Sequence, residues 1–194
     1  MTVTVSPGEP GGGDIPPIAI VRVMAMVLIR PMALEDIPLL EAHMPRRMSG
    51  VHRERWDSQE RGAIVCLIAW RDAVPIGHLV ICWAGSVDEP VASALPGCPS
   101  LEDISVHPDW RSQGIGSRLM AEAERLVTAR GYQRVGLGVA LANVRAWALY
   151  ERQGYGDAEL GPYRIRWPYL DQYGRERWRE ETCIYLTKNL LHGG

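Results

Sequence analysis

The order of the expected elements predicts an α/β fold with a mixed sheet. Strand-like and helical patterns alternate along the chain, and 194 residues with 46% hydrophobic content suit one compact domain with a real core. The formal net charge of −2 provides no overall cationic field, which argues against binding to a nucleic-acid backbone as the main activity. We therefore expect a single domain without a nucleic-acid partner.

The beginning of the chain differs in composition from the rest. Residues 1–17 are rich in glycine and proline and offer little to bury, so we expect a flexible tail there and a folded domain over residues 18–194, with Met24 or Met26 as alternative starts. The apolar run at residues 18–29 is interrupted by Arg22 and is shorter than the roughly 20 residues of a spanning helix. It also lacks the basic start of a secretory signal. These features predict a cytoplasmic protein without a membrane partner.

The four cysteines are not spaced like ligands or a redox pair. There is no CxxC pattern and no histidine close in sequence, so we expect no metal site and no acyl-enzyme. We interpret the thiols as packing groups in a reducing compartment.

The first half of the chain predicts a strand, two helices and a hairpin. Residues 21–30 are typical of a strand, residues 34–44 of a helix, and residues 52–60 of a second helix. Two apolar runs, at residues 63–70 and 76–83, flank a short polar turn and predict a β-hairpin. A proline-rich loop follows.

In the second half of the chain, predicted strands and helices alternate more clearly. A strand is expected at residues 101–106, ended by Pro108. From Ile115, apolar residues recur at helical spacing as far as Gly131, which predicts an amphipathic helix. A strand at residues 134–139, a helix at residues 144–153 and two late strands near residues 163–167 and 182–186 complete the pattern.

A glycine-containing turn joins the strand at residues 101–106 to the amphipathic helix. Its sequence, WRSQGIGS, holds Arg111, Gly114 and Gly116 in an R-x-x-G-x-G arrangement. Glycines allow backbone N–H groups to approach an anion closely, and a helix start adds free donors with a positive partial charge. The turn is neither a Walker loop nor a G-x-G-x-x-G signature. We interpret it as a pyrophosphate cradle, the alternative being a turn that serves geometry alone.

A second motif, NVRAWALYERQGY, begins at Asn143. Together with LEDISVHPDWRSQGIGS, it resembles the two signature motifs of the GNAT family of N-acetyltransferases, over residues 101–155. The resemblance implies a mostly antiparallel sheet flanked by helices on both faces, and acetyl-CoA as the cosubstrate. It also implies that the pantetheine arm pairs with the backbone of Ile104 and Val106 and contacts Asn143. The pyrophosphate would lie on the backbone of Arg111, Ser112, Gln113, Gly114, Ile115, Gly116 and Ser117.

Three of these residues have simpler alternative roles. Arg111 could be a solvated loop charge, and Asn143 suits the N-cap of the following helix. Tyr150 matches the family's general acid at the thiol sulfur, and a phenol with an ordinary pKa of about 10 is protonated at neutral pH and can donate to a thiolate. Its alternative role is packing on one helix face.

Two adjacent carboxylates raise the question of a base. Alternation on an unbroken strand places Glu102 with Ile104 and Val106, and Asp103 on the opposite face. Since family members often take their base from this strand, we assign that role, or the anchoring of the amine, to Glu102. A salt bridge at the sheet rim is the alternative.

The acceptor is less well defined. The resemblance favours direct transfer to a primary amine of a small molecule, and residues 101–103 locally resemble polyamine acetyltransferases. The glutamate that some N-terminal acetyltransferases carry before the asparagine is absent. Aromatic residues in the late segments, such as Trp167, suit an apolar or cationic acceptor, although core or homodimer packing explains them equally well. Alternatives are a protein or peptide acetyltransferase, acting on N-termini or lysines, and a non-catalytic acyl-CoA-binding module.

Overall fold

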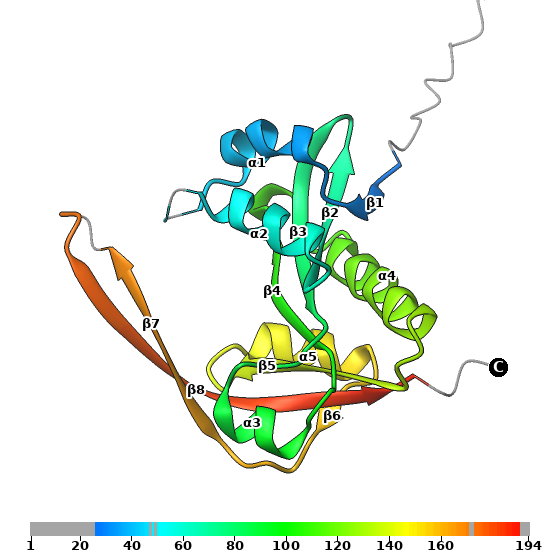
Figure 1. The fold of residues 1–194 in the computed structure, drawn as a ribbon, viewed down its shortest axis with the longest axis vertical. Coiled ribbons are helices and arrows are strands. Elements are labelled where there is room, and N and C mark those ends of the chain that lie inside the picture. The colour runs from blue at the N-terminus through cyan, green and yellow to red at the C-terminus, as the bar shows by residue number, and fades with distance from the viewer. Residues whose placement is uncertain (1–25, 47, 49, 171–172, 191–194) are drawn as a thin grey trace, which may run out of the picture.

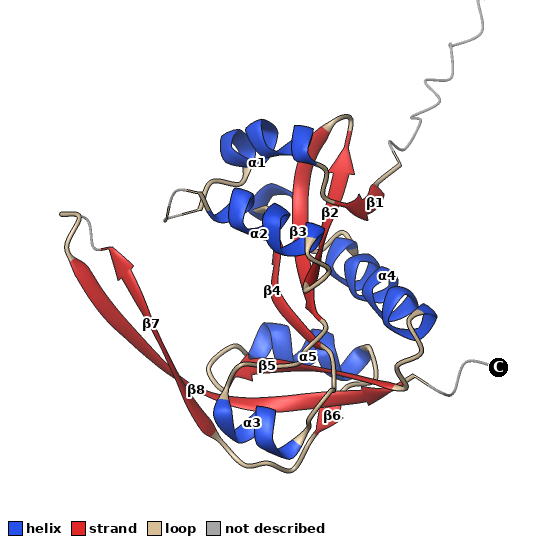
Figure 2. Cartoon of the chain, in the orientation of Figure 1, coloured by secondary structure: helices blue, strands red, loops and turns tan. Residues whose placement is uncertain are grey.

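The computed structural model describes residues 26–46, 48, 50–170 and 173–190. The tail expected at residues 1–17 lies outside this range. One sheet of eight strands dominates the structure, in the order β1-β2-β3-β4-β5-β8-β6, with β7 paired to β8 (Figures 1 and 2). The strands are β1 (Leu28–Pro31), β2 (Ile64–Arg71), β3 (Val74–Cys82), β4 (Ser100–Val106), β5 (Arg134–Ala140), β6 (Gly156–Asp157), β7 (Tyr163–Leu170) and β8 (Glu176–Asn189).

Helices cover both faces of this sheet, as expected. They are α1 (Ile37–His43), α2 (Val51–Glu60), α3 (Glu89–Ala94), α4 (Ile115–Ala129) and α5 (Val144–Arg152), with short 3₁₀ turns η1 (Leu34–Asp36) and η2 (Pro108–Trp110). The main core lies between the sheet and α4, where Leu119, Met120 and Ala123 pack on Leu67 and Leu79. Apolar residues at helical spacing thus bury one continuous stripe of α4.

The opposite face carries two smaller cores. Leu40 of α1 packs with Met32 and with Cys66 and Ile68 of β2. Val91 of α3 belongs to a third cluster, over β7 and β8. Alternate residues of β2 therefore face different cores, which is the pattern expected of a strand buried on both faces.

Every pairing in the sheet is antiparallel except that of β4 with β5. These two parallel strands are in register only at Ser100 and Gly136, and they diverge from there. On its other side, β4 pairs with β3, but the register shifts between His78 and Val80. Asp103 occupies this bulge with φ +48°, a left-handed conformation that is uncommon outside glycine. Beyond Ser100 and Gly136, the sheet is open at its centre, between β4 and β5.

The bulge corrects one expectation about β4. An unbroken strand would place Glu102 on the same face as Ile104 and Val106, whereas the extra residue interrupts the alternation. Leu101 lies in the main core, and Ile104 and Val106 pack against the same core. Side-chain direction in β4 therefore cannot be read from spacing alone.

The remaining elements agree with the sequence, with four differences. Strand β1 begins only at Leu28, whereas a strand was expected over residues 21–30, of which residues 21–25 lie outside the described ranges. Helix α3 lies inside the segment expected to be a loop; it begins with Glu89 and Pro90, and proline is well suited to the first turn of a helix. The two-residue strand β6 was not expected. The late strands β7 and β8 are longer than predicted and form a two-stranded extension of the sheet (Figure 1).

Candidate active site

Two cavities meet beside the opening between β4 and β5. One is a groove of about 610 Å³ lined by β4, α5 and the start of α4. The other is a cavity of about 440 Å³ lined by β4, β5, β7, β8 and the loop before α3. Ile104, Asn143 and Tyr150 line both. We call the first the cofactor groove and the second the acceptor cavity, after the roles that the sequence predicts for their residues.

The cofactor groove contains the glycine turn and the N-terminus of α4. Gly114 caps the helix with φ +76°, and Arg118 is the first residue whose N–H reaches back to the Gly114 carbonyl, at 3.1 Å. Within the described part of the chain, the backbone N–H groups of residues 112–117 have no hydrogen-bond partner. Such a row of free donors at a helix start is a ready anion site, and it fits a pyrophosphate.

Arginine side chains add positive charge to this groove. Arg111 donates from Nε to the Val106 carbonyl at 3.0 Å, and Arg145 donates from Nη2 to the Ser112 hydroxyl at 2.8 Å. Arg152 also lines the groove, whose described lining contains no carboxylate. The charge of the groove therefore matches an anionic ligand.

One edge of β4 is open to the groove. Ser105 and Val106 pair with β3 on one side, whereas beyond Ser100 no described residue of β5 pairs with β4. Ile104 and Val106 are half-buried and line the groove. Their strand edge is accessible for the extended chain pairing that the resemblance implies.

Asn143 and Tyr150 lie on α5, seven residues apart, which is about two helical turns. Asn143 is the N-cap, because its Oδ1 accepts from the Ala146 N–H at 3.2 Å. This capping role is confirmed, and the same residue also lines both cavities. Tyr150 is 8% exposed, and burial raises the pKa of its phenol. The hydroxyl therefore stays protonated at neutral pH and is able to donate.

Glu102 lines the acceptor cavity and not the cofactor groove. Burial raises the pKa of this half-buried carboxyl, and the charge of nearby Asp88 raises it further, against the opposing effect of hydrogen bonds with Cys82 and Ser100. A carboxylate with a raised pKa is a stronger base than an ordinary glutamate. Its chemistry suits the role that the sequence assigns to it.

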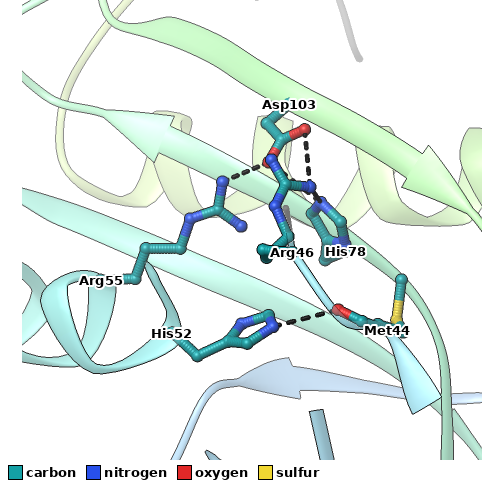
Figure 3. A network of polar contacts seen from close by, with 6 residues as sticks. All are labelled: Met44, Arg46, His52, Arg55, His78 and Asp103. Atoms are coloured by element: carbon teal, nitrogen blue, oxygen red, sulfur yellow. Dashed lines mark hydrogen bonds and ion pairs between the residues drawn. The ribbon is translucent and has the colours of Figure 1, made fainter. Parts of the chain in front are cut away.

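Asp103 also lines the acceptor cavity, so the two acids do not serve different sites. Its carboxylate lies in a network of polar contacts with two arginines and a histidine, shown in Figure 3. Arg46 Nη2 is 2.7 Å from Oδ2, His78 Nε2 is 3.1 Å from the same oxygen, and Arg55 forms a further ion pair. Burial alone would raise the pKa of Asp103, but the contact with His78 and the charge of Arg55 hold it well below its usual range.

The structure brings together most of the predicted site residues. Gln113 is the exception, since it does not line the groove and its amide donates to the Asp109 carbonyl at 3.3 Å. Sequence reasoning missed residues on distant elements that line the two cavities or contact Asp103: Asp88, Glu181, Arg145, Arg152, Arg46, Arg55 and His78. Only Arg145 and Arg152 carried a signal, because they flank the Tyr150 motif.

Other parts of the described structure show fewer features of a functional site. An opening of about 530 Å³ between residues 96–98 and 131–134 contains none of the predicted site residues. In the described ranges, no three His, Cys, Asp or Glu side chains are grouped as metal ligands would be. All four cysteines are free thiols. No helix among these residues has the length and apolar character needed to cross a membrane.

Comparison with known proteins supports the family. The profile of the acetyltransferase (GNAT) family matches residues 32–155. A thialysine N-epsilon-acetyltransferase from Bos taurus is 39% identical over 57 residues, which are 29% of this chain and 34% of that protein. The matched segment thus spans about a third of the length of that relative.

Solved structures show the same fold. A ribosomal-protein-alanine N-acetyltransferase from Brucella melitensis aligns with a TM-score of 0.62 at 20% identity, covering 84% of this chain and 99% of that one. An acetyltransferase from Salmonella typhimurium, solved with its cofactor acetyl-CoA, aligns with a TM-score of 0.61 at 15% identity, covering 88% and 97%. The expected fold is confirmed, and because the family profile covers well over half of the sequence, the chain belongs to the GNAT family of acetyltransferases.

Proposed function

We propose that this protein transfers an acetyl group from acetyl-CoA directly to a primary amine of a small molecule. The observation that carries the proposal is the junction of the two cavities at Ile104, Asn143 and Tyr150. A donor in the cofactor groove and an acceptor in the other cavity would meet there without a covalent enzyme intermediate. Acetyl-CoA is the donor, because the groove suits an anion and two structural relatives were solved with this molecule bound.

Tyr150 acts as the general acid. When the amine nitrogen bonds to the acetyl carbon and the carbon–sulfur bond breaks, the departing thiolate needs a proton. Tyr150 lines both cavities and carries a proton that burial makes harder to lose. The phenol donates it to the sulfur, and the proton removed from the amine balances the reaction.

Glu102 acts as the base or as the anchor of the amine. It lies on β4 two residues before Ile104, one of the shared residues, and its pKa is raised. A free ammonium cannot attack, so a carboxylate that accepts its proton, directly or through water, makes the nitrogen nucleophilic. The same negative charge attracts the ammonium before the transfer.

The names of the relatives agree on the class of acceptor and differ on its size. Thialysine is a small molecule, whereas the Brucella melitensis relative is named for alanine of a ribosomal protein. Both reactions acetylate an amino group. We favour the small molecule because the acceptor side is a cavity of about 440 Å³.

The decisive experiment measures thiol release from acetyl-CoA with separate panels of small amines and of peptides with free N-termini or lysines. We expect release with small amines and a product mass increased by one acetyl group. Preference for peptides would replace the small-molecule acceptor with a protein one. Acetyl-CoA binding without release for any acceptor would indicate a non-catalytic binding module. Sedimentation of the same sample tests the homodimer that the sequence leaves open.

A further inference from the structure

The acceptor cavity has an excess of negative charge. Its lining includes four carboxylates, those of Asp88, Glu102, Asp103 and Glu181, and a single guanidinium, that of Arg166. They come from three separate parts of the fold: the loop before α3, strand β4 and the β7–β8 extension. The excess is therefore a property of the assembled cavity and not of one acidic segment.

Among the described residues, only one of these acidic side chains, Asp103, forms ion pairs. Asp103 pairs with Arg46, Arg55 and His78, none of which lines the cavity. In the described part of the chain, Asp88 and Glu102 form no ion pair. Charge left uncompensated in a concave site favours a bound cation.

Glu181 is likewise without an ion pair among the described residues, although its neighbour Glu180 pairs with Arg164 at 3.2 Å. Arg166, the one cation of the lining, lies over the Trp178 ring, with 4.5 Å between its guanidinium carbon and the ring centroid. Tyr163 and Trp167 also line the cavity, and aromatic rings attract cations. Three carboxylates without an ion pair and two aromatic residues thus favour a ligand that carries more than one positive charge.

We infer that the acceptor is an aliphatic diamine without a carboxylate of its own. This deepens the proposed function and rests on it. One amino group reacts next to Glu102 and Tyr150, and the second remains an ammonium held by Asp88 and Glu181. These two residues line the acceptor cavity and not the cofactor groove. An acceptor such as lysine, which adds a carboxylate, would meet repulsion in the same cavity.

The test compares kcat/KM for 1,4-diaminobutane, n-butylamine and lysine, measured by thiol release from acetyl-CoA. The three share a primary amine on an alkyl chain and differ in the second charged group. We expect kcat/KM for diaminobutane to exceed that for butylamine, and also that for lysine, by at least tenfold. The double variant Asp88→Asn/Glu181→Gln should reduce the diaminobutane-to-butylamine ratio at least fivefold, mainly through the KM of the diamine.

Both substitutions keep the shape of the side chain, and asparagine remains a good N-cap residue for α3. Glu180→Gln is the matched control, because it removes a charge from the adjacent position of β8, outside the cavity, and should leave the ratio unchanged. Equal kcat/KM for diaminobutane and butylamine, or a preference for lysine, would overturn the diamine and leave acetyl transfer to a small amine intact. Acetyl-CoA binding without transfer to any amine would overturn both proposals. An unchanged ratio in the double variant would remove Asp88 and Glu181 from the assignment.

Discussion

The cofactor groove and the acceptor cavity share three residues and carry opposite charge. Arg111, Arg145 and Arg152 line the groove, together with unpaired backbone N–H groups. The cavity holds four carboxylates against one arginine. The difference in charge suits an anionic donor on one side of the opening in the sheet and a cationic acceptor on the other. The uncharged phenol of Tyr150 lies between them, since Tyr150 lines both cavities.

A similar contrast separates two neighbouring residues of β4. Glu102 is half-buried without an ion pair among the described residues, and its pKa is raised, whereas Asp103 is surrounded by cations and its pKa is lowered. The surroundings, and not the residue type, decide which of the two carboxylates is the stronger base. Glu102 is suited to chemistry, and Asp103 to holding β4 against α2 and β3.

Reversing the charge of the groove should have the largest effect. In Gly116→Glu, a carboxylate would occupy the row of free N–H donors, so we expect no acetyl-CoA binding by calorimetry because of like-charge repulsion and lost space. Gly116→Ala is the control, since its Cβ would meet Leu149 Cδ2 at 3.4 Å and Val106 Cγ2 at 4.0 Å, both ordinary contacts. Unchanged affinity in the glutamate variant would refute the groove as the donor site.

Removing the proton donor at the boundary should affect turnover without affecting either cavity. For Tyr150→Phe we expect kcat to fall by about 100-fold, the usual size of a general-acid contribution, with acetyl-CoA affinity kept within about twofold. Tyr155→Phe is a matched control: this neighbouring tyrosine hydrogen-bonds Glu124 at 3.1 Å and does not line either cavity. Equal turnover in Tyr150→Phe and the wild type would exclude Tyr150 as the acid.

Removing the ion pairs of Asp103 should lower the stability of the protein. Asp103→Ala leaves the guanidinium groups of Arg46 and Arg55 together without their carboxylate, so we expect the free energy of unfolding to fall by about 1–3 kcal/mol in urea titrations at pH 7. Because the folded pKa of Asp103 is lowered, its stabilisation is present above about pH 4 and is lost as the pH falls through the folded value. The difference between variant and wild type should therefore shrink in acid. A difference that stays constant with pH would show that the charge contributes little.

The smallest expected effect is a displacement of the pH profile. An ordinary glutamate has a pKa of about 4.3. The pKa of Glu102 is raised, so its carboxylate form becomes predominant at a higher pH than in an ordinary glutamate. We expect kcat/KM to fall about tenfold per pH unit below that pKa, which lies above 4.3. In Glu102→Gln this acid limb should disappear while acetyl-CoA affinity is kept. The same limb in both proteins would assign the base to another group.

Local patterns identified residues that the structure brings together in the cofactor groove, Gln113 excepted, while their roles stay predictions. The glycine turn, the start of α4 and the pair Asn143 and Tyr150 are each contained in one short segment, where helix spacing and backbone donors follow from neighbouring residues. The acceptor side was predicted only in part. Glu102 was identified, but the directions in which the neighbouring side chains of β4 point were not. The bulge at Asp103 breaks the alternation of faces from which these directions were inferred.

Sequence alone predicted the family and the α/β class, both of which are confirmed. It also supplied the hypotheses of an anion cradle and of a proton donor, since each depends on residues that are close in the chain. Tertiary structure alone decided that Asp88, Glu102 and Glu181 line one cavity, and that Arg46, Arg55 and His78 contact the Asp103 carboxylate. These contacts join elements far apart in sequence, and they depend on strand register and on the opening between β4 and β5. The sign of the charge around a bound acceptor is the sum of such contacts, so it exists only once the chain has folded.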